Sequence, residues 1–208
     1  MLIPKNKVEF PRRRDFLSLL PKKSVCAEFG VFTGKFSKHI LYHTDPKKLY
    51  LVDPYWKRYG DEFFWKPRQG STWEVFTTAI TTVKDVENKD CVSFVIDDDL
   101  SFLENIKDDT FDWVYLDSSH DYEDTLKELE SVCTKVKEDG LICGHDYYEN
   151  RRHRHHGVCK AINEWIDARD DYGLFLLDTR SQWMISKKGV DCRINKEILE
   201  RVLITNSK

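Results

Sequence analysis

The fold is decided by the stretch Val25-Cys26-Ala27-Glu28-Phe29-Gly30-Val31-Phe32-Thr33-Gly34. Its first five residues are a short apolar run of the kind that forms a buried parallel strand. Gly30 permits a tight turn and the close approach of a ligand, and Gly34 lets a following helix lie near the sheet. The stretch therefore predicts a strand, a glycine turn and a helix, the first unit of an α/β fold.

The turn differs from the GxGxxG phosphate loop of dinucleotide enzymes, where pyrophosphate needs several free backbone donors. Glu28 places a carboxylate beside the turn, which suits a cationic ammonium or sulfonium group better than a phosphate. Asp53 follows the next apolar run, at the position from which an acidic side chain reaches ribose hydroxyls. The plainer interpretation is that Gly30 and Gly34 are ordinary turn glycines and that Asp53 only begins a loop.

Short apolar runs alternate with helix-period segments along the chain, which is typical of βαβ units around a parallel sheet. The predicted strands are Val25 to Phe29, Leu49 to Val52, Val92 to Ile96, Trp113 to Leu116, Leu141 to Cys143, Leu174 to Leu177 and Trp183 to Ile185. The predicted helices include Lys35 to Tyr42, about Thr72 to Val83 after the capping box Ser71-Thr72-Trp73-Glu74, and Tyr122 to Val136 with Asp139-Gly140 as its end. No linker or repeat interrupts the 208 residues, so we expect one domain over residues 1–208.

The composition indicates a small-molecule partner. Acidic and basic side chains nearly cancel to a formal net charge of -3, so no overall field calls for nucleic acid. The sequence shows neither a signal peptide nor a membrane-spanning run, and we expect a cytoplasmic protein with no membrane partner. The oligomeric state stays open, a homo-oligomer included. The six widely spaced cysteines show no CxxC pair, so we expect reduced thiols and neither disulfides nor zinc ligands.

Two long segments, Pro54 to Gly70 and Tyr147 to Gly157, each follow the carboxyl end of a predicted strand, where open α/β sheets bind ligands. The first carries six aromatic residues that either stack on a ligand or pack as a satellite cluster. The second is rich in arginine and histidine. It either binds an anionic part of a substrate or forms a solvated lid.

Four motifs in order give the chain a resemblance to a known family. They are Glu28-x-Gly30-x-x-x-Gly34, Leu51-Val52-Asp53-Pro54, the run from Val114 to Glu123 (VYLDSSHDYE), and the run from Gly140 to Tyr147 (GLICGHDY). With Gly157-Val158-x-x-Ala161, they resemble small class I methyltransferases over about Val25 to Trp165. Within these, the chain is most similar to the sugar O-methyltransferase group that includes macrocin O-methyltransferase and other macrolide-sugar enzymes.

The resemblance implies a Rossmann-like, seven-stranded, mostly parallel sheet with helices on both faces and an antiparallel C-terminal hairpin. It also implies S-adenosylmethionine as methyl donor, with Glu28 near the methionine moiety, Asp53 on the ribose and Asp98 near the adenine amino group. Taken alone, Asp98 would more often be a helix cap. The cofactor-binding set is then Glu28, Gly30, Gly34, Asp53, Asp98 and Asp117.

Four polar residues follow the fourth and fifth predicted strands and converge on one rim: Asp117, His120, His145 and Asp146. A sugar hydroxyl is so weak an acid that a side-chain base does not deprotonate it readily unaided. We therefore expect a divalent metal and a nearby base. The resemblance implies Asp117, His145 and Asp146 as ligands of Mg²⁺ or, because an imidazole is present, of Mn²⁺. We expect His120 to be the general base, with His145 second and Asp117 as a further catalytic residue.

We therefore predict an S-adenosylmethionine-dependent O-methyltransferase that acts on a sugar hydroxyl of a glycan or of a nucleotide-linked sugar. The alternatives are a catechol-type or other small-molecule O-methyltransferase, and a catalytically inactive cofactor-binding module. A nicotinamide-dependent oxidoreductase should carry a phosphate-binding glycine triplet, which is missing. N-methylation usually comes with an Asn/Asp-Pro-Pro-Tyr turn, but Leu116-Asp117-Ser118-Ser119 stands in its place.

Overall fold

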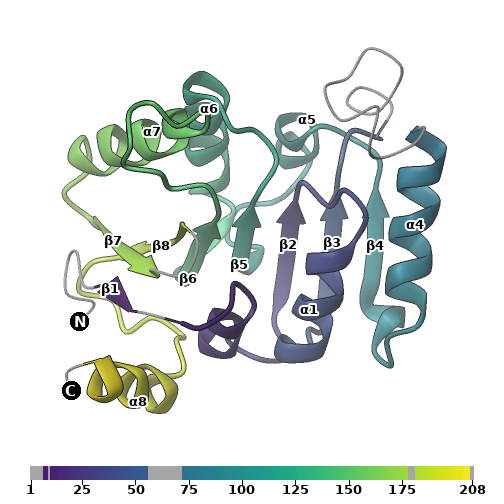
Figure 1. Cartoon of the computed structure of the whole chain (residues 1–208), viewed down its shortest axis with the longest axis horizontal. Helices are drawn as coiled ribbons and strands as arrows, with labels where there is room; N and C mark the ends of the chain where they lie inside the picture. Colours follow the sequence, from purple (N-terminus) through teal and green to yellow (C-terminus); the bar gives the residue numbers. More distant parts are fainter. Residues whose placement is uncertain (1–6, 9, 56–71, 178–180, 207–208) are drawn as a thin grey trace.

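A computed structural model of the chain describes residues 7–8, 10–55, 72–177 and 181–206, arranged as one central sheet with helices packed on it (Figure 1). The strands are β1 (Lys7–Val8), β2 (Val25–Phe29), β3 (Lys48–Val52), β4 (Val92–Val95), β5 (Phe111–Leu116), β6 (Val136–Gly144), β7 (Tyr172–Leu177) and β8 (Gln182–Lys187). The helices are η1 (Asp15–Leu19), α1 (Lys35–Thr44), α4 (Thr72–Lys84), η2 (Lys89–Cys91), α5 (Asp99–Glu104), α6 (Tyr122–Val132), α7 (His156–Asp167) and α8 (Lys196–Asn206).

The strand order is β1-β7-β8-β6-β5-β2-β3-β4. Strands β2 to β6 pair in parallel, whereas β8 runs antiparallel to both β6 and β7. This confirms the Rossmann-like fold with an antiparallel C-terminal hairpin. The two-residue strand β1, which pairs in parallel with β7, was not predicted, because a strand so short leaves no periodic pattern in the sequence.

Alternate residues of the parallel strands point to opposite faces of the sheet, and both faces are covered. Cys26 belongs to a core with η1, α1 and α4, against which residues of α8 also pack. Its neighbour Ala27 belongs to a second core, built with α5, α6 and α7. Burial on both faces explains why the strands are continuous apolar runs in the sequence.

The predicted end of α6 at Asp139-Gly140 is wrong. Helix α6 ends at Val132, and Gly140 lies inside β6. A Cβ atom on Gly140 would lie 2.6 Å from Cγ1 of Val136 and 2.8 Å from the carbonyl oxygen of Asp112. The glycine therefore permits a close approach of strands where the β5–β6 register shifts, and does not end a helix.

Two other predicted helices are confirmed: the observed bounds of α1 and α4 agree with the predicted bounds to within two residues. The capping residue Ser71 and the range 56–70, which holds five of the six aromatic residues of the long segment after Asp53, lie outside the described residues. The expectations about them stay predictions. All six cysteines are free thiols. Across the described ranges, the structure holds no helix that is long and apolar enough to span a membrane.

Candidate active site

The glycine turn after β2 brings two neighbouring strand ends into contact. Gly30 has a positive φ of 85°, and a Cβ atom there would lie 2.2 Å from the carbonyl oxygen of Asp117. Gly34 also has a positive φ, of 72°, but its close neighbour is Ala79 of α4. A Cβ atom on Gly34 would lie 3.1 Å from the carbonyl oxygen of Ala79. Gly34 therefore allows a close contact between the start of α1 and α4, and the expectation that it lets α1 lie near the sheet stays a prediction.

A cavity of about 650 Å³ opens at this turn, at the carboxyl ends of the parallel strands. Pockets of roughly 300–1,000 Å³ are typical of sites for cofactors and small molecules. Five of the predicted site residues line it: Glu28, Gly30, Asp53, Asp117 and His120. Further lining residues include Arg13, Phe32, Phe36, Ser118, Ser119, Arg154 and His155.

Glu28 provides a buried carboxylate at the floor of the cavity, with only 1% of its surface exposed. One carboxylate oxygen accepts a short hydrogen bond from the hydroxyl of Ser37. The other, Oε1, has no hydrogen-bond partner among the described residues. Burial raises the pKa of Glu28 to about 8, against the weaker opposing effect of the Ser37 hydrogen bond. A cationic ligand in the cavity would stabilise the ionised form of this side chain.

Asp53 holds the backbone of the glycine turn. Its Oδ2 accepts hydrogen bonds from the backbone N–H groups of Val31 at 2.9 Å and of Phe32 at 2.8 Å. The side chain is almost fully buried and lines the cavity. Asp53 therefore shapes the turn, and its contact with a ribose stays a prediction.

Asp98 is the N-cap of α5, where its Oδ1 accepts a hydrogen bond from the backbone N–H of Ser101 at 3.0 Å. It is not among the residues that line the 650 Å³ cavity. The helix-cap interpretation of this residue is confirmed, and its contact with adenine stays a prediction.

Three predicted metal ligands gather beside the cavity. Nδ1 of His145 lies 3.1 Å from Oδ1 of Asp146 and 3.5 Å from Oδ1 of Asp117. Burial lowers the pKa of His145, but the two carboxylates outweigh it and the net shift is upward. Burial likewise favours the neutral acid at Asp117, but Arg13 and His145 together lower its pKa. The two carboxylates and the imidazole therefore each stabilise the charged form of the other.

The other oxygen of Asp146 faces the predicted base. Its Oδ2 lies 3.2 Å from Nδ1 of His120, so one carboxylate lies between His120 and His145. Burial favours the neutral acid, yet His145 and then His120 and His155 outweigh it and lower the pKa of Asp146 to about 2. The backbone of Asp146 has a positive φ of 64°, a region that aspartate tolerates better than most residues and that is common at functional sites.

Arg13 is a site residue that the sequence did not reveal. Its guanidinium makes a short ion pair with Oδ2 of Asp117 and donates a hydrogen bond to the hydroxyl of Tyr115 at 2.8 Å. It also lies over the ring of Phe36, with 4.3 Å between Cζ and the ring centroid. The only signal was the basic run Arg12-Arg13-Arg14 before an apolar segment, and nothing in it indicates a partner 104 residues away.

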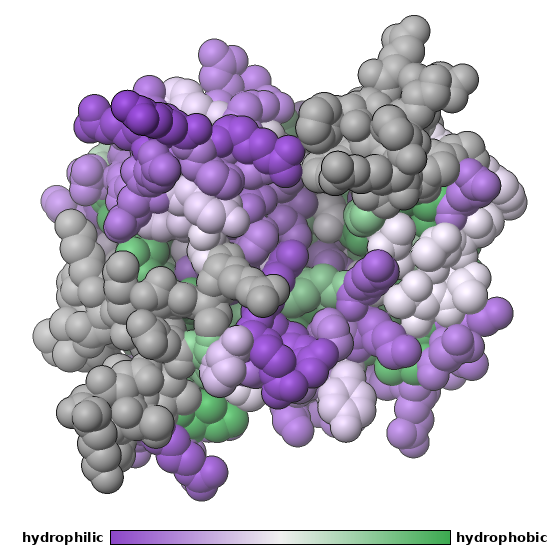
Figure 2. Space-filling view, in the orientation of Figure 1, coloured by the Kyte–Doolittle hydropathy of each residue, from purple (hydrophilic) through white to green (hydrophobic). Residues whose placement is uncertain are grey.

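The arginine- and histidine-rich segment after β6 contributes two lining residues, Arg154 and His155. The ring of His155 meets the ring of His120 at nearly a right angle, with centroids 4.4 Å apart. Burial, followed by the charge of His120, lowers the pKa of His155 to about 4. The surface over α6, α7 and this connection is largely hydrophilic (upper left in Figure 2).

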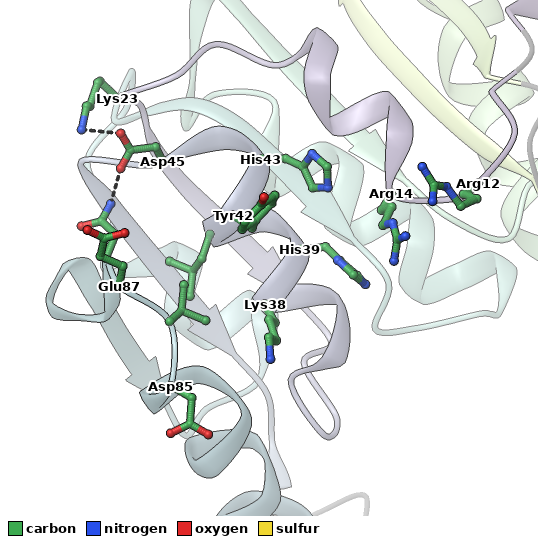
Figure 3. A pocket seen from close by; sticks show the side chains of 13 residues that line it. Arg12, Arg14, Lys23, Lys38, His39, Tyr42, His43, Asp45, Asp85 and Glu87 are labelled. Carbon is green, nitrogen blue, oxygen red and sulfur yellow. Dashed lines mark hydrogen bonds and ion pairs between the residues drawn. The ribbon is translucent and has the colours of Figure 1, made fainter.

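A second cavity, of about 980 Å³, lies around the carboxyl end of α1 (Figure 3). Its basic residues Arg14 and His39 lie on one side of α1, and Asp45 lies on the other. Oδ2 of Asp45 makes an ion pair with Nζ of Lys23 at 2.5 Å. This cavity contains no predicted site residue and lies away from the glycine turn. The smaller cavity is therefore the better candidate active site.

Residues 27–147, more than half of the chain, match the model of a family described as a methyltransferase domain. The chain belongs to this methyltransferase family. The match begins in β2 and ends after His145-Asp146, so it includes the glycine turn and most of the cavity lining. It confirms the expected class, a methyltransferase that uses S-adenosylmethionine. No curated protein sequence is significantly similar to the chain.

Solved structures with this fold include several methyltransferases. An O-methyltransferase from Bacillus cereus in complex with SAH is 15% identical, with a TM-score of 0.58 over 80% of this chain and 75% of that one. The O-methyltransferase TomG from Streptomyces achromogenes, involved in tomaymycin synthesis and in complex with SAM, is 12% identical, with a TM-score of 0.55 over 78% and 72%. An rRNA methylase from Streptococcus thermophilus is 14% identical, with a TM-score of 0.55 over 84% and 93%. At these identities the likeness concerns the fold alone.

Proposed function

We propose that this methyltransferase transfers a methyl group to a hydroxyl of a sugar, in a glycan or in a nucleotide-linked sugar. The observation that carries the proposal is the contact between Nδ1 of His120 and Oδ2 of Asp146, at the rim of the cavity that Glu28 lines. O-methylation requires the removal of a hydroxyl proton next to a bound methyl donor, and this contact provides an oriented base beside the cavity.

The cavity fits the methyl donor in size and in charge. S-adenosylmethionine supplies a methyl group on a cationic sulfonium. The spare Oε1 of Glu28 offers a buried acceptor for a cationic group. Gly30 lines the cavity, and its positive φ of 85° allows the tight turn that forms this part of the wall.

His120 is better placed than His145 to act as the base. A neutral His120 that donates its Nδ1 proton to Asp146 keeps a lone pair on Nε2 for the proton of an acceptor hydroxyl. His120 lines the cavity, whereas His145 lies beside it with its Nδ1 facing the carboxylates of Asp117 and Asp146. We therefore assign His145 and Asp117 to metal binding.

The donor set Asp117, His145 and Asp146 fits a divalent cation, because one ligand atom from each lies within 4.8 Å of the others. When bound, such an ion would lower the pKa of a coordinated acceptor hydroxyl. Arg13 already occupies Oδ2 of Asp117, so Oδ1 is the oxygen left for an ion. Metal assistance is therefore part of the proposal, with Mg²⁺ and Mn²⁺ as the ions to compare.

The side chains around the cavity rim favour a polar acceptor. Ser118, Ser119 and Arg154 line it together with the imidazoles, and hydroxyls and cations are suited to sugar hydroxyls and to an attached phosphate. The resemblance to sugar O-methyltransferases supports the same acceptor class. A catechol acceptor is the alternative to test against it.

An assay of S-adenosylhomocysteine release tests the proposal. Deoxysugars, nucleotide sugars and catechol are offered as acceptors, each with and without a chelator and with Mg²⁺ or Mn²⁺ restored. We expect turnover with a sugar acceptor, and its loss on chelation. Turnover with catechol alone would replace the acceptor class, and full activity in chelator would contradict the metal assistance.

A further inference from the structure

His155, from the connection between β6 and α7, lies against His120 and close to Asp146. The rings of His120 and His155 are 4.4 Å apart between centroids, and Nδ1 of His120 is 3.2 Å from Oδ2 of Asp146. One ligand atom from each of the three side chains lies within 4.8 Å of the other two. Two imidazoles and one carboxylate thus gather at the cavity rim.

This donor set suits a different ion from the oxygen-rich set beside it. Two imidazoles and a carboxylate are typical ligands of Zn²⁺ and related transition ions, whereas Mg²⁺ prefers oxygen ligands alone. Ligand atoms around a tetrahedral zinc are about 3.3 Å apart, given bonds of about 2.0–2.1 Å. The contact of His120 with Asp146 already has this separation, and a side-chain rotation of His155 would complete the set.

Two further observations point to a ligand at this place. Nδ1 of His155 is buried and has no hydrogen-bond partner within the described ranges, although buried polar atoms are normally paired. Asp146 holds its carboxylate between His120 and His145 from a left-handed backbone conformation with φ of 64°, and such backbone strain is concentrated at ligand sites.

We propose that His120, Asp146 and His155 form a binding site for a transition-metal ion such as Zn²⁺. It is distinct from the set Asp117–His145–Asp146, because Asp146 uses Oδ2 toward His120 and Oδ1 toward His145. A neutral imidazole has one basic lone pair, so an ion on His120 removes the lone pair that a base needs. The ion is therefore expected to inhibit methyl transfer, a consequence that rests on the proposed function.

Metal binding is tested without reference to activity. The purified full chain is titrated with Co²⁺, followed by its visible absorption, and with Zn²⁺, followed by calorimetry. We expect the wild type to bind Co²⁺ and Zn²⁺ at a site that depends on His155. The variant His155→Ala removes one of the three direct ligands. It should weaken the metal affinity by more than the roughly 10–100-fold that is lost when a residue supporting a ligand is removed.

Two control variants locate the ion. His145→Ala removes the imidazole of the other set, and His39→Ala removes one of two histidines whose rings lie 6.2 Å apart on α1. His39→Ala should bind Co²⁺ as the wild type does, and His145→Ala, which removes a contact of Asp146, should weaken binding less than His155→Ala does. Loss of binding in either control, with retention in His155→Ala, would overturn the proposal, as would the absence of binding in the wild type.

An activity arm separates this proposal from the proposed function. Zn²⁺ should inhibit the wild type in the S-adenosylhomocysteine release assay, and His155→Ala should need at least about tenfold more Zn²⁺ for the same inhibition. If no acceptor turns over at all, the Co²⁺ spectrum still decides the metal site. Equal zinc sensitivity of the two proteins would overturn the inhibitory role.

Discussion

Nδ1 of His120 lies 3.2 Å from Oδ2 of Asp146, and these residues follow two neighbouring parallel strands, β5 and β6. The sheet therefore brings together two groups that are 26 positions apart in the chain. A carboxylate in this position fixes the imidazole tautomer and stabilises the charge that forms when the ring accepts a proton. The pair is the basis for assigning the base to His120.

Replacement of the base should affect turnover and not cofactor binding. We expect His120→Gln to lower kcat by about 10²–10⁴-fold, the usual contribution of general-base catalysis, with an unchanged Kd for S-adenosylhomocysteine. The matched variant is His145→Gln, which changes an imidazole on the neighbouring strand end. A loss of kcat in His145→Gln that excess Mg²⁺ restores is expected of a metal ligand, whereas retention of kcat in His120→Gln would reassign the base.

A side chain at Gly30 should prevent the turn from forming. The added Cβ of Gly30→Ala would lie 2.2 Å from the Asp117 carbonyl oxygen, in a backbone with φ of 85°. We expect a loss of about 3 kcal/mol or more in the free energy of unfolding, from strain and overpacking together. In the control Gly173→Ala the nearest atom is 3.6 Å away, so urea denaturation should show little change. Equal stability of the two variants would contradict this role of Gly30 in the turn.

The ionisation of Glu28 should be visible in cofactor binding. The folded protein without ligand holds this proton up to about pH 8, far above the ordinary value of 4.5, and a cationic ligand favours the ionised form. The affinity for S-adenosylmethionine should therefore rise between pH 6.5 and 8, by at most about tenfold per unit. The variant Glu28→Gln is the control, because ionisation of the ligand itself affects its affinity for both proteins equally. The ratio of the wild-type affinity to the Glu28→Gln affinity should therefore change with pH. A constant ratio would refute the assignment.

The same raised pKa has a consequence for stability. Between pH 4.5 and 8 the folded state binds this proton and the unfolded chain does not. Its contribution to the free energy of unfolding is therefore fully present below pH 4.5 and is lost as the pH rises through 8. In the absence of ligand, thermal unfolding should show Glu28→Gln gaining stability relative to the wild type as the pH rises over this range. The opposite trend would contradict the burial of an uncompensated carboxylate.

Arg13 should contribute to stability through its partly buried ion pair with Asp117. Removing one partner of a fully buried pair costs about 3–5 kcal/mol, and Arg13 is 28% exposed, so we expect about 2 kcal/mol for Arg13→Ala. Arg12 makes an ion pair with Asp15 but is 64% exposed, and Arg12→Ala should cost under about 1 kcal/mol. Urea denaturation of both variants decides whether Arg13 holds the site together.

Local patterns predicted the fold well. β2 has the predicted bounds Val25–Phe29, because a continuous apolar run followed by a glycine turn has one favourable arrangement in an α/β sheet. The strand ends that carry Asp117 and Asp146 could be placed at one rim for the same reason. The extra strand β1 could not be predicted, since two residues carry no period.

What the sequence could not predict depends on distant contacts. The role of Gly140 depends on the backbone of Asp112 in the neighbouring strand, and the pairing of Arg13 depends on where the N-terminal segment packs. His155 was expected only as part of a basic loop. Its position against His120 follows from how the connection before α7 folds over the strand ends, which no local spacing encodes.

Calorimetric titration of S-adenosylhomocysteine into the wild type and into Asp53→Ala tests most directly whether the cavity at Gly30 is the methyl-donor site. Asp53 holds the turn through Val31 and Phe32, so its loss should remove the site. We expect one molecule bound per chain in the wild type and no detectable binding in Asp53→Ala. Equal affinities, or no binding by the wild type, would contradict the account.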